Sequence, residues 1–261
     1  MKKTYLFIVI IMIILAAVAV WFIKNEKVST EISAEKGLEM SISSISQTDN
    51  FYNIQVEYPQ FGDIVVAFND QVSIFITGEI DTFKKNVKDN WDARIATILP
   101  DQTVSENPEE PFDFIADWKP IQLNNKYLSF VINIYYFSGG AHGFNKVYAL
   151  NYDIIQKKEI TIDDFLGSSP QALQKLSQIA VQQVTSQLQS SGVQIDDVLT
   201  QMIQQGTQPT LDNYRNFNFN YNSLTIYFQQ YQVVPGYIGP VTITIFKNTL
   251  EENSIISDYL K

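Results

Sequence analysis

The chain contains no cysteine and a single histidine, His142, among its 261 residues. Disulfides and a cysteine-linked lipid anchor are therefore excluded, and stability must come from core packing. A zinc site with two histidine ligands and a cysteine–histidine catalytic pair are excluded as well. A serine–histidine–aspartate triad would have to use His142, but the sequence has no G-x-S-x-G nucleophile elbow. We accordingly expect no metal, no cofactor and no enzymatic activity.

Basic residues are also scarce, with 18 Lys and Arg against 28 Asp and Glu and a formal net charge of −10. This excess of negative charge disfavours nucleic acid as a partner. Solubility is the simpler explanation for it. The alternative is that the charge attracts a cationic protein partner, over a range of about one Debye length.

Charged residues are absent from Thr4 to Ile23, a stretch of mostly apolar side chains. As a helix it would be about 30 Å long, which matches the hydrocarbon core of a bilayer. A signal peptide cleaved after Ala17-Val18-Ala19 is the alternative, but the apolar run continues past that point and favours retention. We expect residues 1–23 to be a single-pass anchor that contacts the bilayer through residues 4–23. The N-terminus would then lie in the cytoplasm and the rest outside the cell, or be secreted if the segment is cleaved.

Residues 24–36 are polar and charged, and we expect them to be a linker. Apolar and polar residues then alternate around Met40 and again from Tyr52 to Tyr58, with the turn signal QTDN between them, which predicts a β-hairpin. From Phe68 to Val87 the apolar residues recur every three or four positions, which predicts a helix of about twenty residues. Proline and acidic residues at 99–111 predict an exposed loop. We place a boundary there, between an N-terminal α+β module (37–111) and a C-terminal α+β domain (112–261).

The C-terminal domain begins with strand patterns at 128–137 and 147–152, followed by a short strand at 160–162. Ser169 and Pro170 predict the start of a helix that ends before Gly192, and a shorter helix follows from Asp196 or Asp197 to Gln205. Further strands are expected at 217–220, 224–231 and 241–245. Because helices gather between runs of strands, the order predicts an α+β fold of mostly antiparallel sheets packed with a few helices, in two subdomains.

Glycines surround the histidine in the segment SGGAHG, residues 138–143. This segment lacks the Gly-Lys-Ser/Thr ending of a phosphate-binding loop and the spacing of a dinucleotide fingerprint. Consecutive glycines allow a tight turn or a bulge between paired strands, and this structural role is the simplest interpretation. A ligand contact is the alternative. The candidate ligand-binding residues in this turn are Gly139, Gly140, Ala141 and His142.

The segment YFQQYQVVPGYIGP, residues 227–240, sets tyrosines among prolines and glycines. A rigid loop of this kind can expose tyrosine rings, which stack on sugars or bind protein partners, although core packing also explains them. Tyr231 and Tyr237 are the candidate ligand-binding residues of this loop. The acid pairs Asp163/Asp164 and Asp196/Asp197 are expected to cap helices. Glycoside hydrolysis would need two carboxyl groups facing each other across a cleft, so a carboxylate-dependent cell-wall hydrolase stays an alternative.

The glycine turn, the following strand with its Asp163-Asp164-Phe165 end, and the Tyr-x-Val-x-Pro-Gly-Tyr-x-x-Gly loop resemble a bacterial extracytoplasmic domain of unknown function. That domain, with its GGAH motif, occurs in the lysozyme-sensing anti-sigma-V factor and beside the catalytic domain of PdaC-type peptidoglycan deacetylases. The run FYNIQVEYPQF is similar to the partner module that often precedes it. The resemblance covers about residues 38–250.

The resemblance implies an envelope domain that binds a lysozyme-like protein or a peptidoglycan fragment, and it implies no catalytic residues. Three residues precede the apolar segment, too few to hold a sigma factor, so we expect no anti-sigma activity. The PdaC-type catalytic domain needs two histidines, and we expect this chain not to be that enzyme. The expected function is therefore binding in the cell envelope, with a purely structural envelope role as a further alternative.

Overall fold

The computed structural model describes residues 38–97, 107–139 and 142–260. The predicted membrane segment and the predicted linker lie outside these ranges. Within them, no helix is both long and apolar enough to cross a membrane. The described residues belong to one compact unit.

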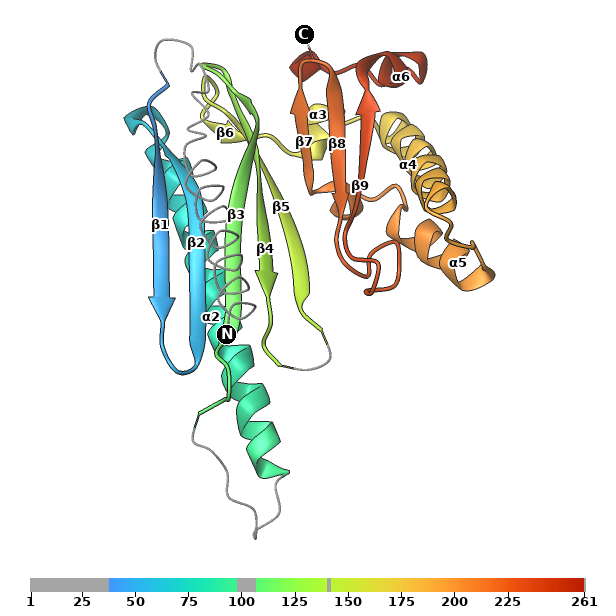
Figure 1. Cartoon of the computed structure of the whole chain (residues 1–261). Helices are drawn as coiled ribbons and strands as arrows, with labels where there is room; N and C mark the ends of the chain where they lie inside the picture. The colour runs from blue at the N-terminus through green and yellow to red at the C-terminus, as the bar shows by residue number, and fades with distance from the viewer. Residues whose placement is uncertain (1–37, 98–106, 140–141, 261) are drawn as a thin grey trace, which may run out of the picture. The chain divides into compact units, whose positions relative to one another are not determined.

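Six strands form the larger sheet, in the order β1-β2-β3-β4-β5-β6 (Figure 1). β1 and β2 are the predicted hairpin, and all neighbouring strands are antiparallel except β2 and β3, which are parallel. The boundary expected at residue 111 falls between β2 and β3, two paired strands of this sheet. The strand bounds are β1 Met40–Thr48, β2 Tyr52–Phe61, β3 Phe112–Leu123, β4 Tyr127–Tyr136, β5 Phe144–Asp153 and β6 Lys158–Glu159.

Helix α2, Val66–Ala96, follows the 3-10 turn η1, Asp63–Val65, and covers one face of the larger sheet (Figure 1). The helix has 31 residues rather than about twenty. Its last turns are stabilised by the i,i+4 ion pairs Lys85–Asp89 and Lys88–Asp92, which an apolar pattern does not reveal. The predicted apolar stripe is buried along its whole length: Phe68, Val72, Ile76, Ile80, Phe83 and Val87.

A second core lies between the smaller sheet, in the order β7-β8-β9, and helices α4 and α5. The predicted caps are confirmed: the Ser169 hydroxyl accepts from the Ala172 N–H, and the Asp196 carboxylate accepts from the Leu199 N–H. The bounds are α3 Ile162–Phe165, α4 Pro170–Ser190, α5 Asp197–Gly206, η2 Asp212–Tyr214, β7 Phe217–Asn220, β8 Ser223–Phe228, β9 Val241–Phe246, α6 Lys247–Glu252 and η3 Asp258–Leu260.

Strand β4 is covered on both faces along its first half. Leu128 and Phe130 belong to the core beneath α2. On the opposite face, the buried Ser129 hydroxyl donates to Oδ1 of Asn151 over 2.7 Å, and Nδ2 of Asn218 in β7 donates to Ser129 Oγ over 3.1 Å. The smaller sheet therefore meets the larger one on the face opposite α2. The predicted α+β class with mostly antiparallel sheets is confirmed.

Candidate functional site

The glycine-rich segment connects β4 to β5, which pair antiparallel from Tyr136 and Phe144 onward. The predicted chain reversal is therefore confirmed. Gly139 has a φ of +93°, a conformation that favours glycine. Gly140 and Ala141 lie outside the described residues.

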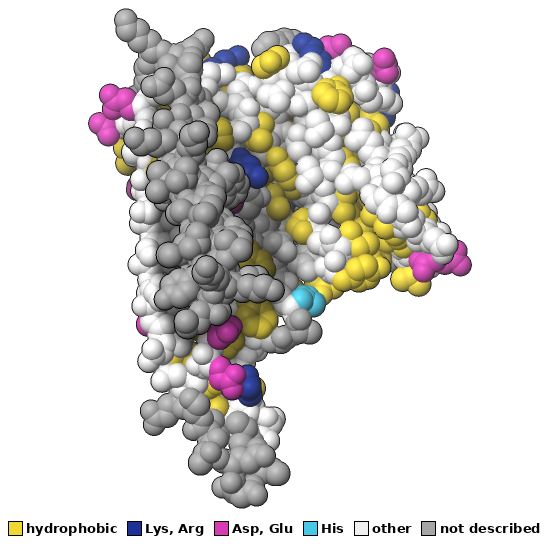
Figure 2. All heavy atoms as spheres, viewed as in Figure 1, with side chains coloured by type: hydrophobic (Ala, Val, Ile, Leu, Met, Phe, Trp, Pro, Cys, Tyr) yellow, Lys and Arg dark blue, Asp and Glu magenta, His cyan; other side chains and the backbone are white. Residues whose placement is uncertain are grey.

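His142 is exposed on the surface, beside hydrophobic side chains (Figure 2). Its Nε2 lies 3.3 Å from the hydroxyl of Tyr231, and its Nδ1 lies 3.0 Å from the carbonyl oxygen of Gly143. The ring of Phe144 has its centroid 5.5 Å from that of His142 and 6.3 Å from that of Tyr231. The structure thus brings together two candidate residues that are far apart in the sequence.

The loop that carries Tyr231 is hydrogen-bonded to the outer edge of β5. The Asn145 N–H donates to the side-chain oxygen of Gln230 over 3.0 Å, and the Val147 N–H donates to that of Gln229 over 3.1 Å. The Gln229 amide also donates to the carbonyl of Val147. Two glutamine side chains thus take the place of a neighbouring strand at alternate positions of β5. Because Tyr231 follows directly, these bonds fix its place beside His142.

Two glycines make room for two tyrosine rings. A Cβ atom on Gly143 would overlap the ring of Tyr135, and a Cβ atom on Gly236 would overlap the ring of Tyr231. Each ring therefore lies against bare backbone, which glycine allows. Tyr231 itself has a φ of +69°, an uncommon value for a residue with a side chain. The positions of both rings thus depend on these glycines.

The Tyr135 ring borders a groove of about 470 Å³ on the face of the larger sheet opposite α2. We call it the Tyr135 groove; Asp117, Asn133, Asn145 and Pro240 are among its lining residues. The Asn133 amide donates to the Asp117 carboxylate over 2.7 Å, which holds both polar groups on the same face. An exposed aromatic ring beside paired hydrogen-bonding groups is an arrangement suited to a saccharide.

Tyr237, the last candidate residue, is 84% exposed. Tyr135, Asp117 and Asn133 were not among the residues predicted from the sequence. A signal was present, because Asn133 is a polar residue within a run of apolar ones. Whether the candidate residues bind a ligand stays a prediction.

A separate pocket of about 370 Å³ lies beside β6 and α3; we call it the Glu159 pocket, and Asn151, Asp163, Leu211 and Asp212 also line it. The Glu159 side chain is exposed at the rim of this pocket; its partial desolvation there raises its pKa, and the charge of Asp164 raises it further. The predicted strand at 160–162 is wrong, because Thr161 caps α3 instead.

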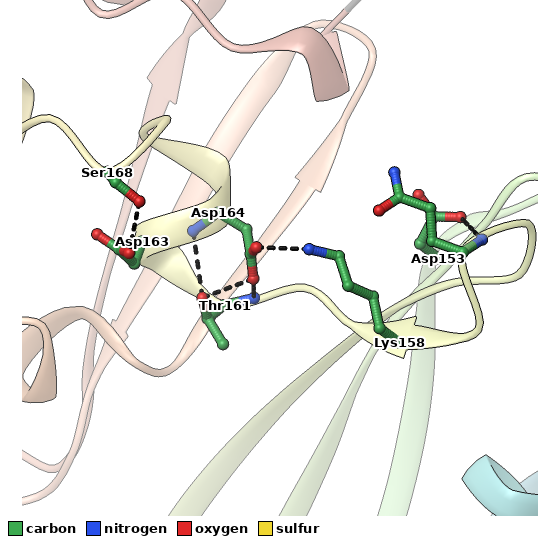
Figure 3. Close-up of polar contacts among 7 residues, drawn as sticks. Asp153, Lys158, Thr161, Asp163, Asp164 and Ser168 are labelled. Atoms are coloured by element: carbon green, nitrogen blue, oxygen red, sulfur yellow. Dashed lines mark hydrogen bonds and ion pairs between the residues drawn. The ribbon is translucent and has the colours of Figure 1, made fainter.

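The acidic residues around this pocket differ in their partners (Figure 3). Asp164 accepts from Lys158 over 2.6 Å and from the Thr161 N–H over 2.9 Å, which confirms its capping role. Asp163 accepts from the Ser168 hydroxyl over 2.7 Å. Across the described ranges, no cluster of three or more His, Asp or Glu side chains is placed to hold a metal ion.

The chain matches two family models. Residues 45–145 match the model described as "Deacetylase PdaC", and residues 163–247 match the model described as "Protein of unknown function (DUF3298)". The chain is also 26% identical over 231 residues to the peptidoglycan-N-acetylmuramic acid deacetylase PdaC of Bacillus subtilis (strain 168). That alignment covers 88% of this chain and 45% of the relative, so the chain spans less than half of the relative's length.

Two solved structures are similar to this chain, and the first of them shares its fold. A member of the DUF3298 family from Bacteroides fragilis superposes with a TM-score of 0.53 at 16% identity, covering 82% of this chain and 92% of that one. A DUF3298 family protein from Pseudomonas aeruginosa PAO1 gives a TM-score of 0.49 at 15% identity, covering 85% of this chain and 95% of that one. The predicted likeness to a domain of unknown function beside PdaC is confirmed, whereas the relation to an anti-sigma factor stays a prediction.

These matches correct one expectation. From the lack of cysteine and the single histidine we expected no enzyme. The match to a deacetylase family model and the similarity of most of the chain to a peptidoglycan deacetylase contradict that expectation. The segment that matches the DUF3298 model thus follows a segment that matches the PdaC deacetylase model.

Proposed function

We propose that this chain recognises the glycan strands of peptidoglycan in the bacterial envelope and takes part in their enzymatic modification. The observation that carries the proposal is the Tyr135 ring, held against Gly143 at the border of a polar groove. A tyrosine ring offers an apolar face to the C–H groups of a sugar. Asp117 and Asn133 beside it offer hydrogen bonds to hydroxyl and acetamido groups.

The relative supports the same substrate class, because its name assigns it to peptidoglycan. The proposal includes the envelope location and the predicted membrane segment. The other proposed partner is a lysozyme-like protein, which the net charge of −10 would attract if that protein is basic.

Retention on purified peptidoglycan sacculi tests the proposal, with acetate release measured in the same samples as the enzymatic readout. We expect the chain to co-sediment with sacculi and the variants Tyr135→Ser and Gly143→Ala to bind about fivefold more weakly, since an aromatic contact contributes about 1 kcal/mol. Gly143→Ala keeps the identity of every residue that lines the groove and displaces only the Tyr135 ring. Tyr221→Ser, at an exposed tyrosine in the β7–β8 turn, is the matched control.

Equal retention of all three variants would contradict the role of the groove, and the absence of any retention would contradict glycan recognition. A parallel assay with lysozyme separates the two partners. Retention of lysozyme without retention on sacculi would favour the protein partner.

The Glu159 pocket favours a second candidate function, a carboxylate-dependent cell-wall hydrolase. Glycoside hydrolysis needs one protonated carboxyl group that donates to the leaving oxygen and a second carboxylate that acts on the opposite side. The raised pKa of Glu159 suits the first role, and Asp163 or Asp212 in the same pocket suits the second.

Release of reducing ends from peptidoglycan measures this activity. We expect Glu159→Gln to lower it by about 100-fold or more, because general acid catalysis contributes that much. Glu57→Gln, at an exposed position in β2, should leave it unchanged. If wild type releases no reducing ends, the hydrolase candidate is wrong.

A further inference from the structure

Trp91 forms a wall shared by two hollows at the C-terminal end of α2. One hollow, of about 480 Å³, is also lined by Asp49 and Asn50 from the β1–β2 turn, by Tyr52 at the start of β2, and by the ion pair Lys88–Asp92. The other, of about 430 Å³, is also lined by Arg94 and by Gly139 of the glycine-rich turn. All these residues lie within the segment that matches the PdaC deacetylase model.

The Trp91 ring is fixed in place by its neighbours. The ring of Phe51 meets it edge-on at 5.9 Å between centroids, and that of Phe112 does so at 6.4 Å. Trp91 is half-buried, so part of its ring faces the two hollows. A rigid indole with hydrogen-bonding side chains nearby is suited to the C–H face of a pyranose. Asn50 lies in one hollow to bind its substituents, and Asn90 in the other donates to the Ser138 carbonyl over 2.8 Å.

The two hollows differ in net charge, because Lys88 and Asp92 in the first hollow pair with each other over 2.6 Å and leave the charge of Asp49 in excess. In the first, the N–H groups of Tyr52 and Phe51 and the Gln47 amide hydrogen-bond the Asp49 carboxylate, and these bonds lower its pKa and keep it negative. In the second, the charged side chain is Arg94, whose guanidinium lies over the Trp91 ring at 5.6 Å from the centroid. Among the described residues, Arg94 forms no ion pair. Its charge is therefore available to an anion.

We propose that the Trp91 hollows bind an amino sugar that carries a carboxylate, with the sugar ring on Trp91 and the carboxylate on Arg94. Asp49 repels a carboxylate, so the first hollow takes the uncharged substituents and the second takes the acid. This site lies outside the Tyr135 groove, and its assignment to the cell wall rests on the proposed function. It would distinguish the acidic sugar of a glycan strand from its neutral neighbour.

The test compares N-acetylmuramic acid with N-acetylglucosamine, which lacks the lactyl carboxylate. Binding to the full chain is followed by the indole N–H signal of Trp91 in NMR, assigned with Trp91→Phe. We expect wild type to bind the acidic sugar about tenfold more tightly, as a charge-assisted hydrogen bond provides. Arg94→Gln should remove this preference and keep the affinity for N-acetylglucosamine.

Lys85→Gln is the matched control, because Lys85 is an exposed cation on the same helix. It should behave as wild type. Glucuronic acid as a third ligand shows whether Arg94 accepts any sugar acid or requires the lactyl group. Equal affinity for both amino sugars in wild type, or an unchanged preference in Arg94→Gln, would overturn the proposal. If sacculi retain the chain in that case, the proposed function stands without this site; if neither sugar nor sacculi bind, both fail.

Discussion

Three tyrosine hydroxyls lie where burial disfavours the charged phenolate. Burial raises the pKa of Tyr227 to about 12. Burial and the charge of Glu79 raise the pKa of Tyr148 to about 12, and burial raises the pKa of Tyr214 as well. In each case the folded chain holds the proton more tightly than the unfolded chain, whose tyrosines titrate near 10. The stability that these protons contribute is complete below pH 10 and is lost as the pH rises toward 12.

Tyr227→Phe should reduce this alkaline loss, because phenylalanine carries no ionisable group. Between pH 10 and pH 12 we expect the free energy of unfolding of the variant to fall by about 2 kcal/mol less than that of wild type. Urea unfolding at pH 7, 10 and 11.5 measures it. Tyr237→Phe is the control, since Tyr237 is 84% exposed. If both variants lose stability in parallel with wild type, burial of Tyr227 does not set its pKa.

At the scale of single residues, the sequence predicted His142 and Tyr231 as candidates, because both lie among glycines and prolines in turn segments. It did not predict Tyr135. That residue lies within the strand pattern predicted at 128–137, which does not indicate that its ring is 38% exposed. The smaller sheet covers part of this face of β4, and the residues beyond its end remain exposed to solvent. The position of that end depends on contacts between segments distant in the sequence. The same limit applies to Trp91 and Arg94, whose hollows are built from segments distant in the sequence.

Two glycines in helices, Gly206 and Gly78, differ in the space that surrounds them. Gly206 ends α5, and a Cβ atom there would overlap the backbone carbonyl of Gln232. Gly78 lies inside α2, and a Cβ atom there would meet no atom within 4 Å. We expect Gly206→Ala to lower the free energy of unfolding by about 2 kcal/mol or more, because backbone cannot move aside as a side chain can. Gly78→Ala should raise it by about 0.5–1 kcal/mol.

Urea unfolding of both variants at pH 7 measures the contrast. Each variant adds the same methyl group, so each controls for the other. A destabilising Gly78→Ala would show that the middle of α2 depends on the absence of a side chain. A neutral Gly206→Ala would show that the Gln232 segment shifts freely.

At the scale of elements, apolar periodicity and caps predicted α2, α4 and α5, since these signals are local. The strand expected at 160–162 shows where local signals mislead. Ile160 and Ile162 alternate as in a strand, but the hydroxyl of Thr161 accepts from the Asp164 N–H and the Asp164 carboxylate accepts from the Thr161 N–H. This capping box starts a helix. The parallel pairing of β2 with β3 was not predicted either, because it joins strands on both sides of a long helix.

Over the whole molecule, two cores meet through a small buried polar network. Nδ2 of Asn218 donates to Ser129 Oγ over 3.1 Å, to the carbonyl of Phe130 over 3.0 Å and to Oδ1 of Asn151 over 3.2 Å. These acceptors belong to the larger sheet, whereas Asn218 belongs to the smaller one. Losing the Asn218 donor removes buried hydrogen bonds between the two sheets, which costs about 0.5–1.5 kcal/mol for each bond. We therefore expect the network to couple the unfolding of the two cores.

Asn218→Leu tests this coupling by removing the donor at similar volume. Trp91 and Trp118 both pack against the core of the larger sheet, so their fluorescence reports that core, while far-UV circular dichroism reports both. With Trp21 replaced by Phe throughout, the two signals should give one urea midpoint in the parent chain and separate midpoints in Asn218→Leu. Asn133→Leu, the same change at the Tyr135 groove, should keep a single midpoint. Coincident transitions in Asn218→Leu would mean that apolar contacts between the sheets, rather than the network, make the fold cooperative.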